Sequence, residues 1–164
     1  MRTYAVVETP IGGLGVGVAG GAVVRVSFGA TPLADDPPDA LDPVLATALR
    51  EVREYFAGDR TAFSVATAFT RGSAFERAVW EQIASIPYGQ TRTYGQIARA
   101  VGDPGAAQAV GAACGRNPVP VIVACHRVVA ANGRLGGFGG GLPRKRRLLQ
   151  LEARVAIEQG VDPG

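Results

Sequence analysis

The sequence predicts an α+β fold in two parts, a small antiparallel sheet with one helix and then a mainly helical region. Apolar and polar residues alternate at residues 4–7 and 22–28, which is typical of half-buried strands. Helix-cap signals dominate after residue 72. The charge changes at the same place, because residues 1–70 carry 5 basic and 8 acidic side chains and residues 71–164 carry 12 and 6. We therefore expect two domains, at residues 1–71 and 72–164.

The composition is that of a globular chain. Its 164 residues are 47% hydrophobic and 19% charged, which suffices for a core in one domain or two small ones. Its 23 glycines and 11 prolines follow no collagen-like period. No apolar run approaches the roughly 20 residues that span a bilayer, and no signal-peptide core follows Met1. These observations argue against fibrous and membrane proteins and predict a cytoplasmic one.

The N-terminal part should contain antiparallel strands and one helix. Glycine-rich turns separate the alternating segments. The Pro- and Asp-rich residues 31–43 predict a surface loop, at whose end Asp42 and Pro43 offer an N-cap and a first helical residue. Apolar residues then recur at helical spacing until Gly58 ends the helix, and residues 61–70 should run extended.

The C-terminal part should begin with capped helices. Ser73 and Glu76 have the spacing of a capping box, in which each side chain satisfies a free backbone N–H, and Thr93 and Gln96 repeat it. A short Gly-containing turn then leads to a further helix at residues 105–114. Two helices joined in this way predict a helix-turn-helix.

A candidate nucleophile follows this pair of helices. The apolar residues 121–123 predict a buried strand that leads into Cys125 and His126, before a glycine-rich loop at residues 133–141 and a basic final helix. A thiolate is the reactive form of cysteine, and a histidine linked to a carboxylate can remove the thiol proton. Glu152 on the final helix is a candidate for that carboxylate. The alternative is an inert buried cysteine.

The cysteine and histidine content argues against a metal centre. Cys114, Cys125 and His126 are the only residues of these two types. They are too few for the four ligands of a structural zinc site or for a secreted disulfide framework. We therefore expect no metal and a reducing compartment.

The helix predicted at residues 105–113 consists mostly of alanine and glycine. A helix that reads the major groove normally carries long polar side chains. This helix could instead lie close against a minor groove, or it could serve tight helix–helix packing. Six arginines could either contact DNA phosphates or be solvated surface charges: Arg71, Arg77, Arg92, Arg99, Arg116 and Arg134.

Five segments in a fixed order carry a resemblance to a known family. They are residues 88–98, 106–111, 116–120, 125–129 and 139–142. Together they resemble the O6-alkylguanine-DNA alkyltransferase family over residues 73–155. The resemblance implies a C-terminal winged helix-turn-helix domain that binds DNA and holds the active site. The N-terminal part matches only in layout, and resembles the family's small ribonuclease-H-like domain.

The resemblance also implies the reaction. Family members flip O6-alkylguanine, and also O4-alkylthymine, out of duplex DNA and move the alkyl group irreversibly onto a cysteine, once per molecule. By position, Cys125 is the acceptor, His126 takes its proton through a water and Glu152 orients the imidazole. Asn117 would brace the turn between the recognition helix and the active-site strand. Tyr94 would donate a hydrogen bond to the flipped guanine.

Further site residues are implied by the same match. The backbone around Val128 and Gly139 would bind the base edges, and Pro120 and Phe138 would wall the alkyl pocket. The expected DNA contacts are Thr93, Ala106, Ala107, Gln108, Ala109, Gly111, Arg116 and Arg127. The expected partner is double-stranded DNA that contains O6-alkylguanine, bound by a monomer without cofactor, metal or membrane.

Two positions depart from the family pattern, and a third residue has no counterpart in it. Gln108 stands where the family usually has an arginine that fills the gap left by the flipped base, so we expect weaker or slower base extrusion. Ala124 replaces a proline, which frees the backbone before Cys125. Cys114 has no role in the pattern, and is expected to be passive rather than a second alkyl acceptor or an oxidation-sensitive thiol.

Other functions stay open at this point. The chain could be a specialised acceptor for bulky lesions or small-molecule alkyl donors, which Gln108 and Ala124 would favour. It could be a lesion sensor with weak transfer, although such proteins lack the cysteine. A winged-helix regulator would need long base-reading side chains, which residues 105–113 do not provide.

Overall fold

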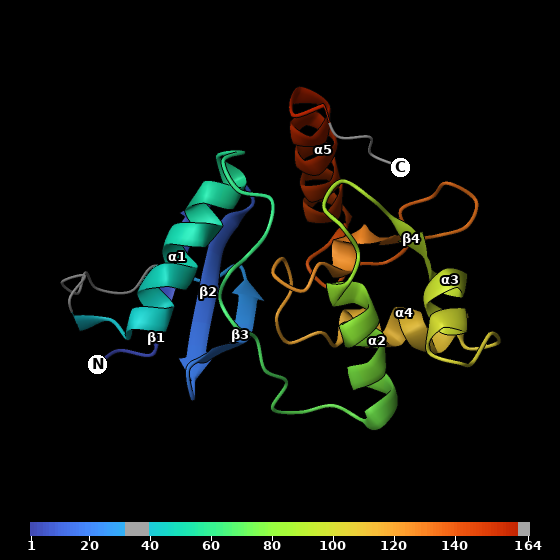
Figure 1. The fold of residues 1–164 in the computed structure, drawn as a ribbon, viewed down its shortest axis with the longest axis horizontal. Helices are drawn as coiled ribbons and strands as arrows, with labels where there is room; N and C mark the ends of the chain where they lie inside the picture. The colour runs from blue at the N-terminus through green and yellow to red at the C-terminus, as the bar shows by residue number, and fades with distance from the viewer. Residues whose placement is uncertain (32–39, 161–164) are drawn as a thin grey trace. The chain divides into compact units, whose positions relative to one another are not determined.

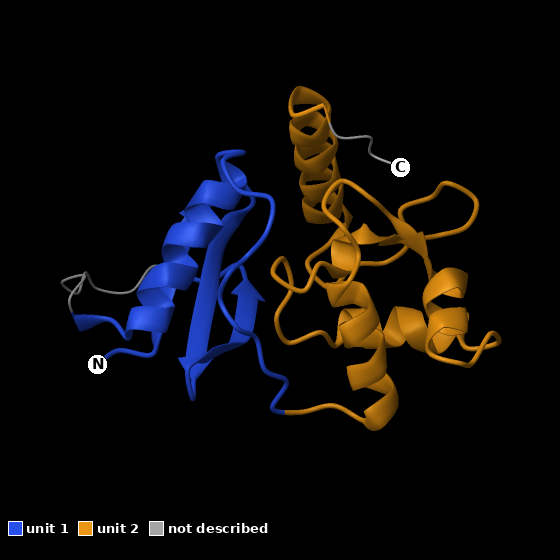
Figure 2. Ribbon diagram, viewed as in Figure 1, with its two compact units in different colours: residues 1–70 blue, residues 71–164 orange. Residues whose placement is uncertain are grey.

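The computed structural model describes residues 1–31 and 40–160. The chain divides into two compact units, unit 1 at residues 1–70 and unit 2 at residues 71–164 (Figure 2). Each unit is considered by itself below. Within the described residues, no helix combines the length and apolar character that crossing a membrane would require.

Unit 1 is an antiparallel sheet with one helix against it (Figure 1). Its strands are β1 (Tyr4–Thr9), β2 (Gly12–Ala19) and β3 (Ala22–Phe28), in the order β1-β2-β3, and its helix is α1 (Pro43–Phe56). The predicted cap of this helix is confirmed, because Asp42 accepts a hydrogen bond from the backbone N–H of Val44 at 2.8 Å.

The alternation of the strands builds the core of unit 1. Ala5 pairs with Val16 and Val7 with Leu14 across β1 and β2, and all four side chains are buried. The apolar face of α1 completes the core with Leu45, Ala48, Leu49, Val52 and Tyr55. Most of the loop predicted at residues 31–43 lies outside the described residues. Residues 61–70 form no strand, and only Thr67 makes a bridge, with Val23.

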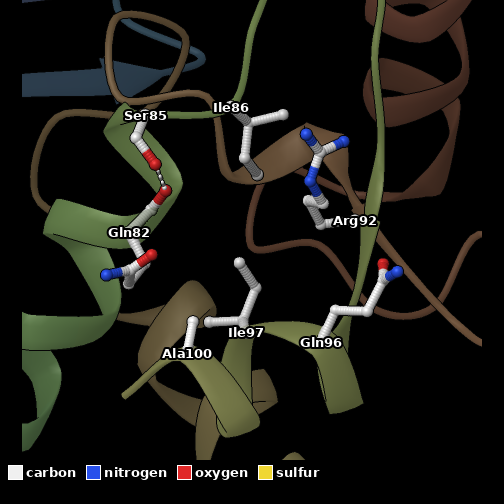
Figure 3. A pocket seen from close by; sticks show the side chains of 7 residues that line it. All are labelled: Gln82, Ser85, Ile86, Arg92, Gln96, Ile97 and Ala100. Carbon is white, nitrogen blue, oxygen red and sulfur yellow. Dashed lines mark hydrogen bonds between the residues drawn. The ribbon is translucent and has the colours of Figure 1, made fainter. Parts of the chain in front are cut away.

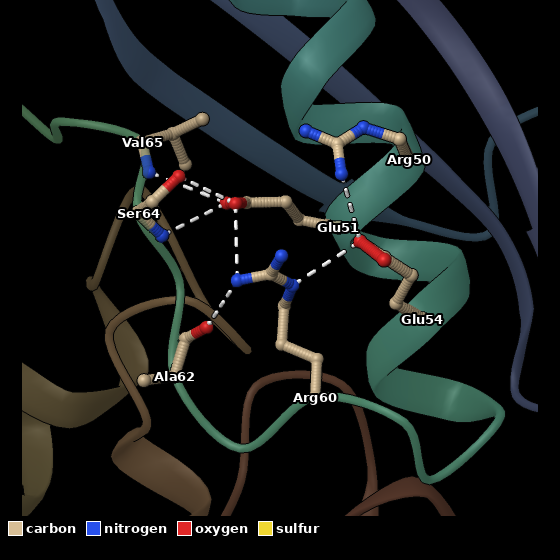
Figure 4. Close-up of polar contacts among 7 residues, drawn as sticks. All are labelled: Arg50, Glu51, Glu54, Arg60, Ala62, Ser64 and Val65. Atoms are coloured by element: carbon tan, nitrogen blue, oxygen red, sulfur yellow. Dashed lines mark hydrogen bonds and ion pairs between the residues drawn. The ribbon is translucent and has the colours of Figure 1, made fainter.

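A buried carboxylate fastens residues 60–65 to α1 (Figure 4). Glu51 accepts hydrogen bonds from Ser64 N at 2.9 Å and Ser64 Oγ at 2.5 Å, and one oxygen lies 3.2 Å from Arg60 Nη1. Burial alone would raise the pKa of Glu51, but the donors of Ser64 and Val65 and the charge of Arg60 hold it below its ordinary value. Glu51 is therefore an ionised and fully bonded structural brace.

The regular structure of unit 2 is mainly helical (Figure 1). These are α2 (Ala74–Ala84), α3 (Tyr94–Ala100), α4 (Ala107–Gly115) and α5 (Leu142–Glu158). Both predicted capping boxes are confirmed, since Ser73 with Glu76 and Thr93 with Gln96 exchange both hydrogen bonds. Trp80 is fully buried and donates from Nε1 to the carbonyl of Ala113 at 2.8 Å, which joins α2 to α4.

Two very short strands bring distant residues together. β4 (Arg92–Thr93) pairs in parallel with β5 (Val128–Val129). Because α3 begins directly after β4 and the short 3-10 helix η2 (Cys125–Arg127) ends directly before β5, the pairing places Tyr94 near the segment that holds Cys125.

The strand predicted at residues 121–123 is not formed. These residues lie in a turn, in which Val123 N donates to Val119 O at 2.9 Å and Val121 has φ 73°. Asn117 holds the turn from inside, accepting from Val119 N at 2.9 Å and donating to Val123 O at 2.8 Å. Pro120 lacks the N–H that a strand would use. A short apolar run fits a buried turn as well as a strand, and here the asparagine and the prolines select the turn.

Candidate active site

Cys125 opens η2, directly after the turn that Asn117 holds. The residue is 4% exposed. Burial raises the pKa of its thiol, while the Asn117 amide and the charge of Lys145 act in the opposite direction. Because burial has the larger effect, the thiol keeps its proton at neutral pH. It therefore needs a base before it can attack an electrophile.

His126 and Glu152 form a buried pair that can supply this base. His126 Nε2 lies 2.8 Å from Glu152 Oε2, and both residues are almost fully buried. Burial alone would raise the pKa of Glu152, but His126 and the Arg127 guanidinium hold it well below its usual range. An ionised carboxylate can only accept, so Nε2 must carry the proton. Within the described part of the chain, the buried Nδ1 of His126 has no hydrogen-bond partner. In the neutral imidazole with its proton on Nε2, Nδ1 is the nitrogen that carries the lone pair.

Arg127, which was predicted to contact DNA, directs its guanidinium into the protein. Its Nε donates to Glu152 Oε1 at 2.7 Å and its Nη2 to Oε2 at 3.0 Å, while Nη1 donates to the Ile86 carbonyl at 2.8 Å. The guanidinium carbon also lies 5.4 Å from the centre of the Tyr88 ring. The side chain is only 11% exposed, because its charge is directed inward to the carboxylate. Each of its three nitrogens bonds to a group within the protein.

Tyr94 and Lys145 form a second polar cluster near Cys125. Tyr94 Oη donates to the Gly137 carbonyl at 3.3 Å. Lys145 Nζ donates to the carbonyls of Val128 at 2.6 Å and Gly137 at 3.1 Å, and lies 3.5 Å from Tyr94 Oη. Burial raises the pKa of Tyr94 and lowers the pKa of Lys145. The ammonium thus ties the glycine-rich loop to β5 and holds the phenol between them.

Lys145 is a member of this cluster that none of the sequence motifs indicates. It is the only lysine of the chain, in a run of basic residues at residues 144–147, and it is fully buried whereas Arg146 and Arg147 are exposed. The one available signal was this choice of lysine in a chain whose other basic residues are all arginine.

The glycine-rich loop passes very close to Tyr94. Gly136 has φ 74°, and a Cβ at this position would collide with the Tyr94 hydroxyl. Both the left-handed backbone and the missing side chain are therefore required here. A Cβ at Gly139 would lie 3.4 Å from the Gly115 carbonyl, so the loop also runs beside the end of α4.

Helix α4 has one buried face and one exposed face. Val110 and Ala113 are buried against the rest of unit 2, which accounts for packing on that side. On the other side Gln108 and Ala109 are exposed, and Gly111 lies against the Tyr94 ring. Apart from Gln108, the exposed face thus carries only small residues, and it borders the Tyr94 cluster.

The remaining predicted DNA-contact and substrate residues lie on the same unit. Arg116 follows α4 with an exposed side chain that pairs with Glu76 at 3.3 Å. The other DNA-contact residues, all half-buried, are Thr93, Ala106 and Ala107. Of the substrate residues, Pro120 and Val128 are buried, Phe138 is half-buried and Gly139 is exposed. Their roles stay predictions.

Cys114 lies close to the reactive centre. It lies one turn after Gly111 on α4, and its thiol interacts electrostatically with Cys125, Tyr94 and Lys145. Burial, with a smaller effect of Cys125, raises its pKa to about 12. The Cys114 thiol is therefore protonated at neutral pH, in agreement with a passive role.

Two hollows of unit 2 contain none of the predicted catalytic residues. One, of about 230 Å³, lies between the end of α2 and α3 (Figure 3) and is lined by Gln82, Ser85, Ile86, Arg92, Gln96, Ile97 and Ala100. The other, of about 300 Å³, is lined by Arg71, Gly72, Glu76, Trp80 and Arg116. In the described residues, no group of three or more Cys, His, Asp or Glu side chains could hold a metal ion.

Comparisons with known proteins agree with this arrangement. Residues 74–154 match the family model described as 6-O-methylguanine DNA methyltransferase, DNA binding domain. A relative from Methanosarcina acetivorans, named methylated-DNA–protein-cysteine methyltransferase, is 41% identical over 152 residues, which are 91% of this chain and 97% of that protein. The solved structure of Mycobacterium tuberculosis O6-methylguanine methyltransferase shares 41% identity over 95% of both chains, with a TM-score of 0.81.

A further solved structure, Mycobacterium tuberculosis OGT in complex with DNA, has a TM-score of 0.79 and 41% identity over 93% of both chains. The relatives are similar to this chain over nearly its whole length, so the predicted α+β fold is confirmed together with the predicted family. By sequence and by fold, the chain belongs to the O6-methylguanine-DNA methyltransferase family.

Proposed function

We propose that this protein repairs O6-alkylguanine in duplex DNA by moving the alkyl group onto Cys125. The observation that carries the proposal is the buried series Cys125, His126 and Glu152, in which one imidazole nitrogen is bonded to a carboxylate and the other is unbonded. A thiol, a base and an orienting carboxylate form an activated nucleophile. The name of the Methanosarcina relative, a protein-cysteine methyltransferase acting on methylated DNA, supports it.

The proposed step balances without a cofactor or metal. His126 Nδ1 takes the Cys125 proton through a water, and the thiolate attacks the alkyl carbon bonded to O6. The C–S bond forms as the C–O6 bond breaks, and the electron pair of that bond stays on guanine. The Tyr94 O–H donates to the base and offsets the developing charge. The product thioether does not release the alkyl group, so each molecule acts once.

The surroundings of Tyr94 support its proposed role. Lys145 lies 3.5 Å from Tyr94 Oη and bonds to the Val128 carbonyl, so the phenol is held at the edge of β5. We assign base recognition to the backbone of Val128 and Gly139. We assign the walls of the alkyl pocket to Pro120 and Phe138.

Helix α4 is the proposed DNA-binding element. Its exposed alanines and glycines allow it to approach the sugars and phosphates of a minor groove closely, and Arg116 and Thr93 lie at the ends of α4 and β4, where backbone phosphates would pass. Gln108 is the exposed side chain that would enter the gap left by the flipped base. The DNA complex of the Mycobacterium tuberculosis relative supports DNA as the partner.

We further propose the organisation of the whole chain. Unit 2 would be the DNA-binding and active-site domain, and unit 1 the small ribonuclease-H-like domain, with a boundary near residues 71 and 72. One lesion engages one α4, so a monomer suffices. The protein would act in the cytoplasm on O6-alkylguanine and also on O4-alkylthymine.

A second candidate rests on Gln108 and Ala124. These departures favour a specialised acceptor for bulky lesions or for small-molecule alkyl donors. A lesion sensor with weak transfer is disfavoured, because the chain has Cys125 together with a candidate base, His126, and its carboxylate partner, Glu152.

The deciding measurement is intact-protein mass after incubation with duplex DNA containing O6-methylguanine, with peptide mapping and a Cys125→Ser control. We expect one added methyl on Cys125 and none in the control. Tight binding without a mass change would replace the proposal with the lesion sensor. Transfer from a free base or nucleoside in preference to duplex DNA would favour the specialised acceptor.

A further inference from the structure

Arg127 occupies a position that the proposed reaction does not yet explain. Its guanidinium bonds to both oxygens of Glu152, at 2.7 and 3.0 Å, and Glu152 in turn bonds to His126 at 2.8 Å. All three side chains are nearly or fully buried. The carboxylate is therefore shared between a permanent cation and the candidate base.

The geometry fixes Glu152 more tightly than one hydrogen bond could. A guanidinium presents its donors in a rigid planar fork, which sets both the position and the rotation of a carboxylate. The fork is itself anchored, since Nη1 donates to the Ile86 carbonyl at 2.8 Å and the ring of Tyr88 lies beneath it. Through Arg127, the Glu152 oxygen that accepts from His126 is thus fixed relative to the segment after α2.

The charge of Arg127 also matters to the imidazole. A buried carboxylate without compensation would either take up a proton itself or hold its histidine partner as imidazolium. An imidazolium has no lone pair, so it could not accept the Cys125 proton. With Arg127 in place, the guanidinium and the carboxylate together carry no net charge.

We propose that Arg127 is a positioning residue of the transfer reaction, which aligns Glu152 on His126 and by its charge keeps His126 neutral and ready to accept the Cys125 proton. The inference rests on the proposed function, because it takes His126 as the base.

Other ionisable groups face this cluster and bear on its pH dependence. Tyr88, from the turn after α2, faces both Glu152 and Arg127; burial raises its pKa to about 12, so it stays neutral below that pH. Arg154 and Glu158 of α5 interact with Tyr88 and carry opposite charges. Cys125 is flanked by Lys145 and Cys114. Of these cations, Arg127 is the one seen bonded directly to the Glu152 carboxylate, at 2.7 Å.

The test is the rate of methyl transfer at saturating DNA, measured from pH 5 to pH 9 with two matched variants. Arg127→Gln keeps a donor but loses the charge, and should move the acid limb of the profile upward by about one pH unit, so that transfer is about tenfold slower below the midpoint. Arg127→Lys keeps the charge but loses the fork. It should leave the midpoint in place and lower the rate at all pH values.

Three further readouts separate this role from others. If the role of Arg127 were only structural, transfer by both variants would be slowed equally at every pH. That result would overturn the proposal. If Arg127 instead bound DNA, both variants would need a higher DNA concentration for the half-maximal rate and would show a weaker salt dependence, with an unchanged rate at saturating DNA. That result would also overturn the proposal. Wild-type protein that gains no methyl at any pH would refute the proposed function itself.

A double variant keeps the proposal testable where Arg127→Gln folds poorly. Arg127→Gln combined with Glu152→Gln removes both charges, which avoids a lone buried charge. Because Arg127 acts through Glu152, the double variant should transfer at the rate of Glu152→Gln alone. The inference would be contradicted if the double variant were slower than Glu152→Gln by the same factor by which Arg127→Gln is slower than the wild type.

Discussion

Glu51 in unit 1 and Glu152 in unit 2 are both buried carboxylates held by an arginine. Glu51 is surrounded by Arg60 and by donors of residues 64 and 65. Glu152 is bonded to Arg127 and to His126, whose Nδ1 has no partner in the described structure. Since buried polar groups are normally satisfied, the unbonded nitrogen distinguishes a reactive network from a structural one.

Paired amide substitutions should produce the largest effect and test this difference directly. Both Glu51→Gln and Glu152→Gln place an NH₂ group against donors, and each should lower the free energy of unfolding by about 2–3 kcal/mol. Only Glu152→Gln should slow methyl transfer per folded molecule, by about 100-fold or more, because the base loses its orienting charge. Urea unfolding and single-turnover kinetics measure the two quantities.

The difference between the two carboxylates would be refuted if Glu51→Gln slowed transfer by folded protein as strongly as Glu152→Gln does.

The pH dependence of stability offers a second test of the structural role of Glu51. The pKa of Glu51 in the folded protein lies below its ordinary value of 4.5, so its contribution is complete above that pH and is lost as the pH falls below it. Glu51→Gln should therefore reduce the loss of stability on acidification below pH 4.5.

A pair of glycine substitutions tests whether the transfer rate depends on the exact position of Tyr94 in the second polar cluster of unit 2. Gly136 and Gly133 have similar φ values, 74° and 79°. A Cβ at Gly136 meets the Tyr94 hydroxyl, whereas one at Gly133 meets nothing within 4 Å. Gly136→Ala should displace Tyr94 and slow transfer by about tenfold, while Gly133→Ala should lose stability by about 1 kcal/mol with little change in rate. Equal slowing of both variants would mean that backbone strain alone sets the effect.

Gln108 should affect DNA handling rather than the buried network. Gln108→Arg adds a charge and a planar group for the gap in the base stack, worth about 1 kcal/mol or roughly a fivefold faster transfer on duplex DNA. Transfer from the free base, which has no stack to fill, should not change. No gain on duplex DNA would show that another residue fills the gap.

Cys114 should give the smallest effect. Because the pKa of its thiol is about 12, Cys114→Ala should leave the transfer rate within about twofold of the wild type. Peptide mapping should find the alkyl group on Cys125 only. Alkylation of Cys114 in wild-type protein would show that the second thiol is activated after all.

Local signals explain what could be predicted from the sequence. The capping boxes at Ser73 and Thr93 and the cap at Asp42 depend on residues three or fewer positions apart, so their spacing alone specifies them. The alternation of the first strands likewise reflects one buried face. The motif order then identified the family, which no single residue could have done.

Long-range contacts explain what could not be predicted. Arg127 is next to His126 in sequence, yet its direction depends on Glu152 and on the Ile86 carbonyl, 25 and 41 positions away. The burial of Lys145 depends on a loop that folds over it. The turn at residues 117–123 resembles a strand in its apolar content, and only the bonds of the Asn117 side chain show otherwise.

The hydrogen bond of Trp80 gives the protein an internal optical probe. Trp80 is the only tryptophan of the chain, and its Nε1 lies 2.8 Å from the Ala113 carbonyl in the last turns of α4. Indole emission responds to the polarity and hydrogen bonding around the ring. A shift of α4 on docking would therefore alter the fluorescence, so lesion engagement and alkyl transfer can be timed by stopped flow without a label.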